Sequence, residues 1–243
     1  MLLFVSFCSA AQEVDKSRMS KAHQRAYDAA LALYGTFEGT THFLCSSTIV
    51  SERAVMNSSG KHEYLLLTAG HCVTGDGLPE GLVFGVREQI AEDSPKPELQ
   101  SVDVVRAQND AKYDFAILHL VSDKVYPVIQ IENNVPQIED KVYDVNFSLG
   151  IAKQVALGVV ASGVIDTQTS HGDCDICKGR YMVHIFAAGG ASGSAIISEK
   201  TNKIVGVGEF GFPGTTTGLG CETTVALKEW LKSPQTVAAS PKA

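Results

Sequence analysis

A serine flanked by glycines, in the stretch Gly190-Ala191-Ser192-Gly193, is the first candidate for chemistry in this sequence. Glycine allows the backbone to turn sharply and to bring its N–H groups close to a bound ligand. A nucleophilic serine needs such N–H groups, because they stabilise the negative oxygen that forms when the serine attacks a carbonyl carbon. The motif also occurs in ordinary loops, so it predicts a nucleophile only if other residues can activate Ser192.

His71 is the best candidate for the base. A serine hydroxyl is a poor nucleophile near neutral pH until a base removes its proton. The apolar run Leu66-Leu67-Thr68-Ala69-Gly70 leads directly into His71, and Cys72 follows it. An arbitrary histidine at the end of a strand is more often structural, but these flanking residues favour a functional one.

Asp114 is the best candidate for the carboxylate that orients the base. Such a carboxylate fixes the tautomer of the histidine and stabilises its protonated form. Asp114 opens the apolar run Phe115-Ala116-Ile117-Leu118, although Asp103 and Asp110 compete with it on composition alone. The resulting chain order of histidine, aspartate and serine differs from that of α/β-hydrolases and subtilisins.

Three ordered motifs resemble the trypsin-like (chymotrypsin-fold) serine endopeptidases. Thr68-Ala69-Gly70-His71-Cys72 resembles the family's Thr-Ala-Ala-His-Cys, and Asp114-Phe115-Ala116-Ile117-Leu118 resembles its Asp-Ile-Ala-Leu-Leu. Gly190-Ala191-Ser192-Gly193-Ser194-Ala195 resembles its Gly-Asp-Ser-Gly-Gly-Pro. The resemblance covers about residues 36–232, and the sequence between the motifs is distant.

The resemblance assigns roles to four residues. Ser192 would be the nucleophile, His71 the general base and then the general acid, and Asp114 the orienting carboxylate. The backbone N–H groups of Gly190 and Ser192 would form the oxyanion hole. The implied reaction is hydrolysis of protein or peptide substrates through an acyl-enzyme, without a cofactor and without a metal ion.

The cysteines are expected to form disulfides. The resemblance implies a bond between Cys45 and Cys72, which would hold the His71 loop against its neighbouring strand. The other cysteines after residue 11 are Cys174, Cys177 and Cys221, an odd number. We expect a disulfide here, for example from Cys177 or Cys174 to Cys221. The alternative is a structural zinc held with the histidine three residues before Cys174.

Ala191 marks a departure from the digestive enzymes of the family. Those enzymes have an aspartate before the serine, which pairs with a new N-terminal amine after zymogen cleavage. This sequence also has no Ile-Val-Gly-Gly start before its first strand. Activation by a newly buried N-terminus is therefore not expected. The sequence Gly-x-Ser-Gly-Ser resembles instead the glutamyl endopeptidases and many bacterial or viral members.

Four residues are candidates for binding the substrate. Phe186 lies six residues before Ser192, which in the family's register is near the bottom of the primary specificity pocket. Phe210 would form a wall of that pocket and Gly211 would keep its mouth open. We expect an apolar pocket. Alternatively, if the Glu209 side chain faces the pocket, it would favour a basic substrate residue.

The chain is predicted to be all-β, with two six-stranded antiparallel Greek-key barrels and a helix at each end. We expect residues 12–34 to be a helical segment, 35–126 the first barrel, 127–140 a linker, 141–232 the second barrel with the C-terminal helix, and 233–243 a tail. In the first barrel, strands are expected at Phe43–Val50, Tyr64–Ala69, Leu82–Val86, Val102–Ala107 and Phe115–Val121. In the second, they are expected at Lys141–Phe147, Ala152–Ser162, Arg180–Phe186, Ser194–Ser198 and Lys203–Phe210.

Composition limits the partners and the compartment. The chain has 243 residues and a formal net charge of −7, which argues against nucleic-acid binding. It has no apolar run of transmembrane length, so no stable membrane insertion is expected. Residues 1–11 resemble the end of a signal peptide, which predicts a secreted, periplasmic or extracellular protein; a buried N-terminal segment is the alternative. The oligomeric state is not indicated.

Two other functions remain open at this level. A catalytically silent protease homologue could act as a binding module, although such homologues usually lose a residue of the triad. A serine esterase on the same fold would use the same acyl chemistry, so the motifs alone do not separate it from a protease.

Overall fold

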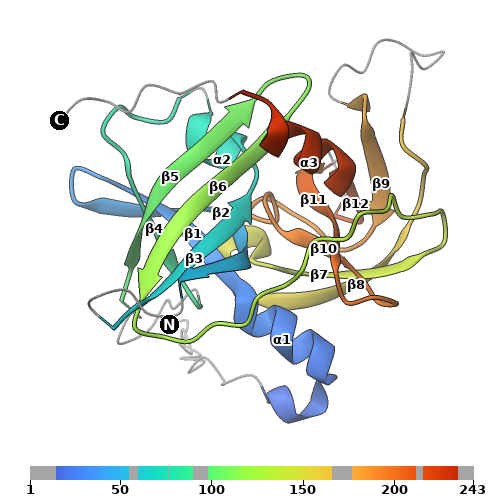
Figure 1. The fold of residues 1–243 in the computed structure, drawn as a ribbon, viewed down its shortest axis with the longest axis horizontal. Coiled ribbons are helices and arrows are strands. Elements are labelled where there is room, and N and C mark those ends of the chain that lie inside the picture. The colour runs from blue at the N-terminus through green and yellow to red at the C-terminus, as the bar shows by residue number, and fades with distance from the viewer. Residues whose placement is uncertain are drawn as a thin grey trace, which may run out of the picture.

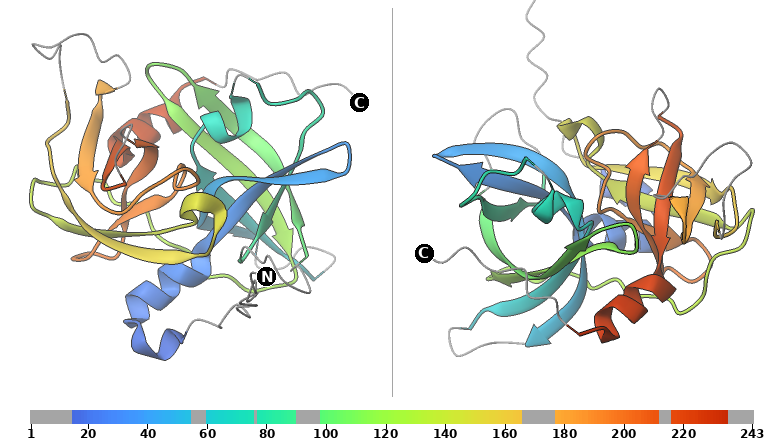
Figure 2. Two further views of the ribbon diagram at one scale, coloured as in Figure 1. Left: turned by 180° about the vertical axis from the view of Figure 1, so that it is seen from behind. Right: turned by 90° about the horizontal axis from the view of Figure 1, so that it is seen from above.

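Two closed antiparallel barrels make up the body of the protein (Figure 1). The computed structural model describes residues 15–54, 60–75, 77–89, 98–165, 177–211 and 216–234. The first barrel has the strand order β1-β2-β3-β6-β5-β4 and the second β10-β11-β12-β9-β8-β7. The two six-stranded barrels confirm the predicted fold class. Figure 2 shows them side by side, with α3 lying across one end of their junction.

The first barrel consists of β1 (Ala30–Phe37), β2 (Thr40–Ala54), β3 (His62–Thr68), β4 (Val83–Arg87), β5 (Gln100–Asn109) and β6 (Asp114–Ser122). The second consists of β7 (Lys141–Asn146), β8 (Gln154–Val160), β9 (Arg180–His184), β10 (Ala195–Ser198), β11 (Ile204–Gly211) and β12 (Gly218–Thr223). The helices are α1 (Lys21–Ala29), α2 (His71–Thr74) and α3 (Thr224–Lys232), with 3₁₀ turns η1 (Lys16–Arg18) and η2 (Ser148–Gly150).

The first strand begins earlier than the sequence pattern predicts. The helix α1 ends at Ala29, and β1 begins at Ala30 inside the segment expected to be helical. Every residue from Ala30 to Tyr34 is buried, since β1 is paired with β2 on one side and β4 on the other. A strand buried on both faces has no alternation of polar and apolar residues, so its pattern resembles that of a helix.

The helix α1 packs on the outside of the barrels, as expected. Lys153, just before β8 of the second barrel, donates a hydrogen bond of 2.8 Å to the backbone oxygen of Tyr27 and lies over the Tyr27 ring. Arg25 donates to the Val128 oxygen, in the connection between the barrels, at 2.9 Å. These contacts attach α1 to the second barrel and to the connection.

The helix α3 joins the two barrels. Thr223 caps its N-terminus by accepting a hydrogen bond from the Ala226 N–H. The buried Trp230 donates from Nε1 to Gln108 of β5 at 2.9 Å and packs against Phe115 of β6, with ring centroids 5.5 Å apart. A helix that follows the second barrel is therefore anchored in the first, which restricts how the barrels move relative to each other.

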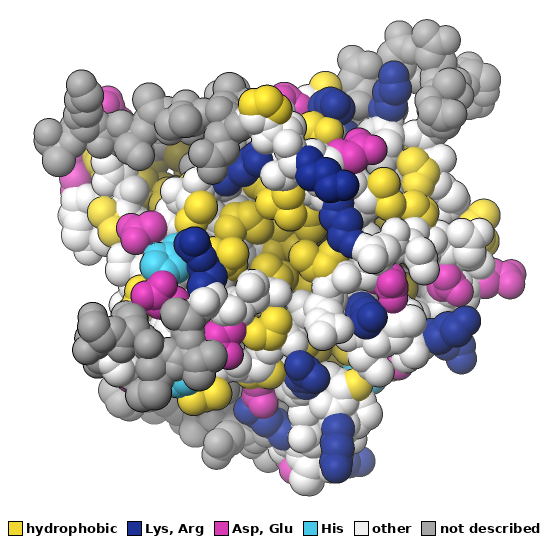
Figure 3. Space-filling view, viewed as in Figure 1, with side chains coloured by type: hydrophobic (Ala, Val, Ile, Leu, Met, Phe, Trp, Pro, Cys, Tyr) yellow, Lys and Arg dark blue, Asp and Glu magenta, His cyan; other side chains and the backbone are white. Residues whose placement is uncertain are grey.

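Hydrophobic side chains also gather in the middle of the face shown in Figure 3, between the two barrels. The cluster beneath includes Leu67 and Ile117 of the first barrel, Val207 of the second and Leu227 of α3. Within the described residues, no helix is both long and apolar enough to cross a membrane.

Candidate active site

His71 and Asp114 meet at the end of β3. The chain leaves β3 at Thr68, turns through Gly70 and enters α2 at His71, while Asp114 is the first residue of β6. The backbone N–H of His71 donates to Asp114 Oδ1 at 2.6 Å, and His71 Nδ1 lies 2.6 Å from Oδ2. Because an ionised carboxylate only accepts hydrogen bonds, Nδ1 carries the proton and Nε2 of the neutral ring is left as the basic nitrogen.

The environment makes His71 a stronger base. Burial lowers its pKa, but the hydrogen bond and negative charge of Asp114, together with the charge of Glu209, more than offset this effect. The pKa of His71 therefore lies above its ordinary value. Asp114 is 2% exposed whereas the His71 side chain is 35% exposed, so the ring is fixed from inside and open to a substrate from outside.

The disulfide between Cys45 and Cys72 is confirmed. It ties β2 to the first turn of α2, with the two Cα atoms 6.1 Å apart. Because Cys72 follows His71 directly, the bond fixes the backbone that carries the base.

Replacing Cys45 and Cys72 together by serine is expected to lower the free energy of unfolding by about 3.5 kcal/mol, the chain-entropy value for a loop of this length. The cysteines are separated by 27 residues in sequence. Urea unfolding monitored by circular dichroism measures the loss, with reduced wild-type protein as a control that should match the variant. An unchanged midpoint would contradict the structural role of the bond.

Ser192 lies beside the strand end that carries His71. Its backbone oxygen accepts from the Ser46 N–H at 2.9 Å, and its hydroxyl donates to the backbone oxygen of Glu209 at 3.1 Å. At Gly193, with φ +81°, an added Cβ would collide with the Thr68 hydroxyl, which only glycine avoids. Among the hydrogen bonds of the described residues, none joins Ser192 to His71. The base and the hydroxyl are on facing barrels, with the hydroxyl turned toward β11.

Gly190 and Ser192 have backbone N–H groups that make no backbone hydrogen bond within the described part of the chain. Gly190 has φ +99°, and a Cβ there would lie 2.8 Å from the Phe147 oxygen and against the Phe43 ring. Only glycine fits this conformation and this space. Two backbone donors of the serine loop are therefore not engaged by another backbone group within the described residues.

The loop that carries Ser192 is held at several points. The Ser46 hydroxyl donates to the Gly190 oxygen at 2.7 Å, and the Ser148 hydroxyl accepts from the Ala188 N–H at 3.1 Å. Both barrels therefore hold the loop through hydrogen bonds. These contacts provide a fixed loop around the buried Ala191, in place of the aspartate of the digestive enzymes.

Asp144 supports the same loop from beneath. It is fully buried on β7 and accepts from Asn146 Nδ2 at 2.9 and 3.0 Å and from the Ser194 hydroxyl at 3.0 Å. Burial raises the pKa of Asp144 to about 7, because these hydrogen bonds only partly offset the cost of removing a charge from water. Ser194, two residues after Ser192, is thus tied to a titrating carboxyl group.

Asp144→Asn is expected to flatten the dependence of stability on pH between about 4 and 7. In this range the unfolded carboxyl group is ionised and the folded one holds its proton, so unfolding releases a proton and the wild type loses stability as pH rises. The slope is at most about 1.4 kcal/mol per pH unit. Chemical unfolding across this range measures it. Asp103→Asn, at an exposed position of β5, is the control. Parallel curves for the wild type and Asp144→Asn would contradict the assignment.

The predicted substrate-binding residues lie on two segments, one after β9 and one at the end of β11. Phe186 follows β9 and is 40% exposed. Phe210 and Gly211 lie at the end of β11, where the Phe210 ring covers Gly220 of β12 and leaves no room for a Cβ there. The Phe210 ring is thus packed against β12, whereas Phe186 is partly exposed.

Glu209 is bound by an arginine that no sequence motif indicates. Arg180 of β9 donates to the two Glu209 oxygens at 2.7 and 3.0 Å, and it lies 2.8 Å from Glu222 of β12. Both oxygens of the Glu209 carboxylate are thus engaged by Arg180, which does not favour their use in binding a basic substrate residue. No local signal marks Arg180, since its partners are far from it in sequence.

The predicted disulfide to Cys221 is wrong. Cys221 is a free thiol buried in the second barrel, and burial raises its pKa well above the ordinary value. Cys177 is disulfide-bonded, whereas Cys174 and the histidine at 171 lie outside the described residues. Packing explains the difference: β12 buries Cys221 completely among apolar side chains.

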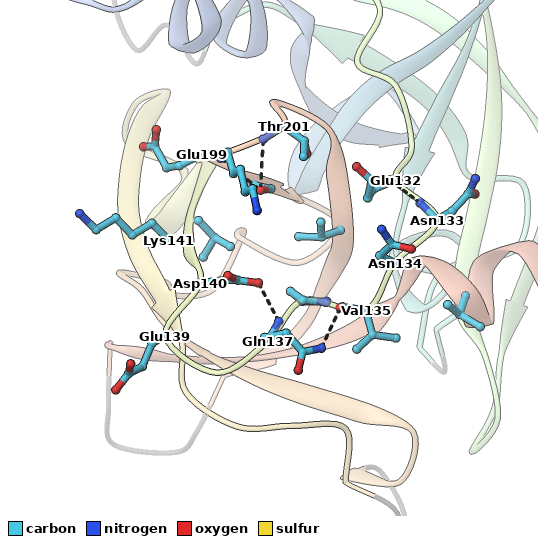
Figure 4. Close-up of a pocket in the computed structure, with 16 residues that line it drawn as sticks. Glu132, Asn133, Asn134, Val135, Gln137, Glu139, Asp140, Lys141, Glu199 and Thr201 are labelled. Atoms are coloured by element: carbon cyan, nitrogen blue, oxygen red, sulfur yellow. Dashed lines mark hydrogen bonds between the residues drawn. The ribbon is translucent and has the colours of Figure 1, made fainter.

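A separate cavity lies on the connection between the barrels (Figure 4). Its lining comes from the connection and the start of β7, from the turn after β10, and from Val205 and Val225, without any residue of the candidate site. Its polar groups are largely satisfied within the loop, as where the Gln137 N–H donates to Asp140 at 2.7 Å. The connection therefore forms its own compact scaffold.

Comparison with known proteins agrees with this geometry. The model of the trypsin-like peptidase domain matches residues 45–207. No match was found among curated proteins.

Solved protease structures share the fold at low sequence identity. The Rv3671c protease from M. tuberculosis in its active form is similar at 13% identity, with a TM-score of 0.64 over 95% of this chain and 90% of that one. The HtrA-type protease AlgW with decapeptide is similar at 16% identity and TM-score 0.61, over 86% and 65% of the two chains. The serine endoprotease from Yersinia pestis is similar at 17% identity and TM-score 0.57, over 86% and 64%.

The chain thus spans less than two thirds of the last two structures. The family match, by contrast, covers more than half of this chain and includes His71, Asp114 and Ser192. With a family match over residues 45–207 and two closed antiparallel barrels, the chain belongs to the trypsin-like peptidase family.

Proposed function

We propose that the protein is a serine endopeptidase in which Ser192, His71 and Asp114 form the catalytic triad. The observation that carries the proposal is the double hydrogen bond between Asp114 and His71, at 2.6 Å each, beside the glycine-flanked serine loop. It fixes the base in the tautomer that can take a proton from a hydroxyl group.

The reaction proceeds in two acyl-transfer steps. The Ser192 hydroxyl leaves the Glu209 oxygen and transfers its proton to His71 Nε2 as Oγ attacks the substrate carbonyl carbon. The N–H groups of Gly190 and Ser192 stabilise the oxyanion. The protonated His71 then donates to the leaving amine, which yields the acyl-enzyme. A water molecule, activated by the same histidine, hydrolyses the acyl-enzyme and releases Ser192.

An extended peptide is the substrate best suited to this site. Phe186 offers apolar surface, since it is 40% exposed, and Glu209 is engaged by Arg180. A related structure, the HtrA-type protease AlgW, holds a decapeptide. Cleavage after apolar residues is therefore expected, and the resemblance to the glutamyl endopeptidases is limited to the Gly-x-Ser-Gly-Ser sequence around Ser192.

The proposal includes export of the protein from the cytoplasm. A disulfide beside the catalytic histidine is stable in an oxidising compartment. The apolar N-terminal residues, which lie outside the described part of the structure, are consistent with a signal peptide. Pulse labelling of the full chain, with sequencing of the mature N-terminus, tests this; a cytoplasmic protein that keeps residues 1–11 would contradict it.

Cleavage of a diverse peptide library, followed by mass spectrometry, tests the proposed function. The wild type should cleave internal peptide bonds and Ser192→Ala should not. A wild type that hydrolyses activated esters but no peptide would be an esterase. A wild type that binds peptides without any turnover would be a silent homologue, and either result would overturn the proposal.

A further inference from the structure

Arg180 is a buried cation that the proposed catalytic steps do not use. Its side chain is 2% exposed, although it follows a segment at the surface of the second barrel. The guanidinium donates to Glu209 of β11 through Nε and Nη2, and Nη2 lies 2.8 Å from Glu222 of β12. One arginine therefore binds carboxylates on two neighbouring strands, β11 and β12.

The same arginine reaches the first barrel. Nη1 donates at 2.9 Å to the backbone oxygen of Ala111, which lies in the turn just before Asp114. Glu222 accepts a hydrogen bond from the backbone of Asp114. The orienting carboxylate of the triad is thus attached to the second barrel through the group formed by Arg180, Glu209 and Glu222, here called the arginine cluster.

The arginine cluster also connects to the other two triad residues through Glu209. The backbone oxygen of Glu209 accepts a hydrogen bond from the Ser192 hydroxyl. The negative charge of the Glu209 carboxylate raises the pKa of His71. Glu209 therefore contacts the nucleophile through its backbone and acts on the base through its charge, while Arg180 fixes where that charge lies.

The charges near His71 can be assigned to particular elements. Asp114 of β6 and Glu209 of β11 act on the imidazole. Arg180 of β9 is balanced by Glu209 and Glu222, with a smaller effect from Asp114. Burial raises the pKa of Glu222 to about 8, although the charge of Arg180 opposes this rise. Burial also raises the pKa of Glu209, but the hydrogen bonds and charge of Arg180 oppose this rise, which leaves Glu209 as the main counter-charge of Arg180.

We propose that Arg180 and Glu209 are positioning residues for the triad: the pair locks the turn that carries Asp114 to the strand that carries the Ser192 acceptor. The inference rests on the proposed serine-protease function. A guanidinium can make these contacts at once because its donors form a planar fork, which a lysine ammonium cannot reproduce.

Steady-state kinetics of Arg180→Lys and Glu209→Gln across pH test the pair, with a fluorogenic peptide found in the library screen. Arg180→Lys keeps the positive charge but loses the planar set of guanidinium donors. We therefore expect kcat to fall on the order of 10-fold or more while KM changes little. Glu209→Gln keeps the shape and loses the charge. The pH at which kcat/KM is half-maximal on the acid side should move to lower pH, because His71 then loses its proton more easily.

Two comparisons separate positioning from general damage. Glu88→Gln removes one negative charge from a different ion pair, with Lys124 at 2.6 Å. It should leave unchanged the pH at which kcat/KM is half-maximal on the acid side. Glu222→Gln should shift this half-maximal pH less than Glu209→Gln does. Thermal unfolding checks that each variant is folded. If Arg180→Lys does not fold, the pH profile of Glu209→Gln tests the proposal by itself.

The proposal would be overturned if kcat/KM of Glu209→Gln became half-maximal on the acid side at the same pH as that of the wild type. A folded Arg180→Lys variant with the full wild-type kcat would overturn it as well. An inactive wild type would instead refute the proposed function itself, so the two failures are distinguishable.

Discussion

His71→Ala is expected to lower kcat/KM for a peptide substrate on the order of 10⁴-fold or more, the largest effect of any change outside Ser192. Without the imidazole, no base removes the Ser192 proton and no acid protonates the leaving amine. The loss should appear in kcat with little change in KM, since the ring acts in the transition state. Peptide-cleavage assays at matched protein concentration measure it.

His62→Ala is the matched control for His71→Ala. His62 also pairs with a carboxylate, Glu52 at 2.8 Å, but it lies at the start of β3 rather than at its end. Its loss should leave activity within about twofold of the wild type, the scatter expected for a change remote from the site. A His71→Ala variant that keeps most of its activity would mean that another group is the base.

Gly70→Ala is expected to lower both activity and stability even though it introduces the alanine that this family usually has before the histidine. A Cβ at Gly70 would overlap the backbone oxygen of Gln108 and lie 2.9 Å from Asp114 Oδ1. Neither neighbour can rotate away, because one is backbone of β5 and the other is held by His71. The added methyl must therefore displace β5 or the Asp114–His71 pair.

Overpacking of this kind costs about 1–3 kcal/mol of stability. A displacement of about 1 Å at the pair is expected to reduce kcat on the order of 10²-fold. Urea unfolding and peptide cleavage measure the two effects on the same preparation. Gly163→Ala is the control, since a Cβ there meets nothing within 4 Å. Wild-type activity in Gly70→Ala would contradict the close packing of β5 on the turn.

The residues with local motifs can be predicted from the sequence. His71 and Ser192 each lie in a short pattern that reflects the geometry of its own turn, and the disulfide from Cys45 to Cys72 follows from the family resemblance. The C-terminal helix can be predicted from Thr223, because a capping residue and helical periodicity are both local signals.

The parts that depend on long-range packing cannot be predicted in this way. The strand β1 has the pattern of a helix because its residues are buried on both faces, which hides the alternation of a strand. The strand β12 is absent from the predicted strands, and with it the burial of Cys221 as a free thiol. Arg180 and Glu222 meet only when β9, β11 and β12 are paired, so no spacing in the sequence indicates their contact.

Covalent labelling with a fluorophosphonate, located by peptide mass spectrometry, tests the central claim most directly. The reagent reacts with a serine that is activated by a base and stabilised by an oxyanion hole. We predict one adduct per chain, on Ser192, that is absent from Ser192→Ala and strongly reduced in His71→Ala. A wild type without an adduct, an adduct on another residue, or equal labelling of His71→Ala would contradict the assignment of Ser192, His71 and Asp114 as a working triad.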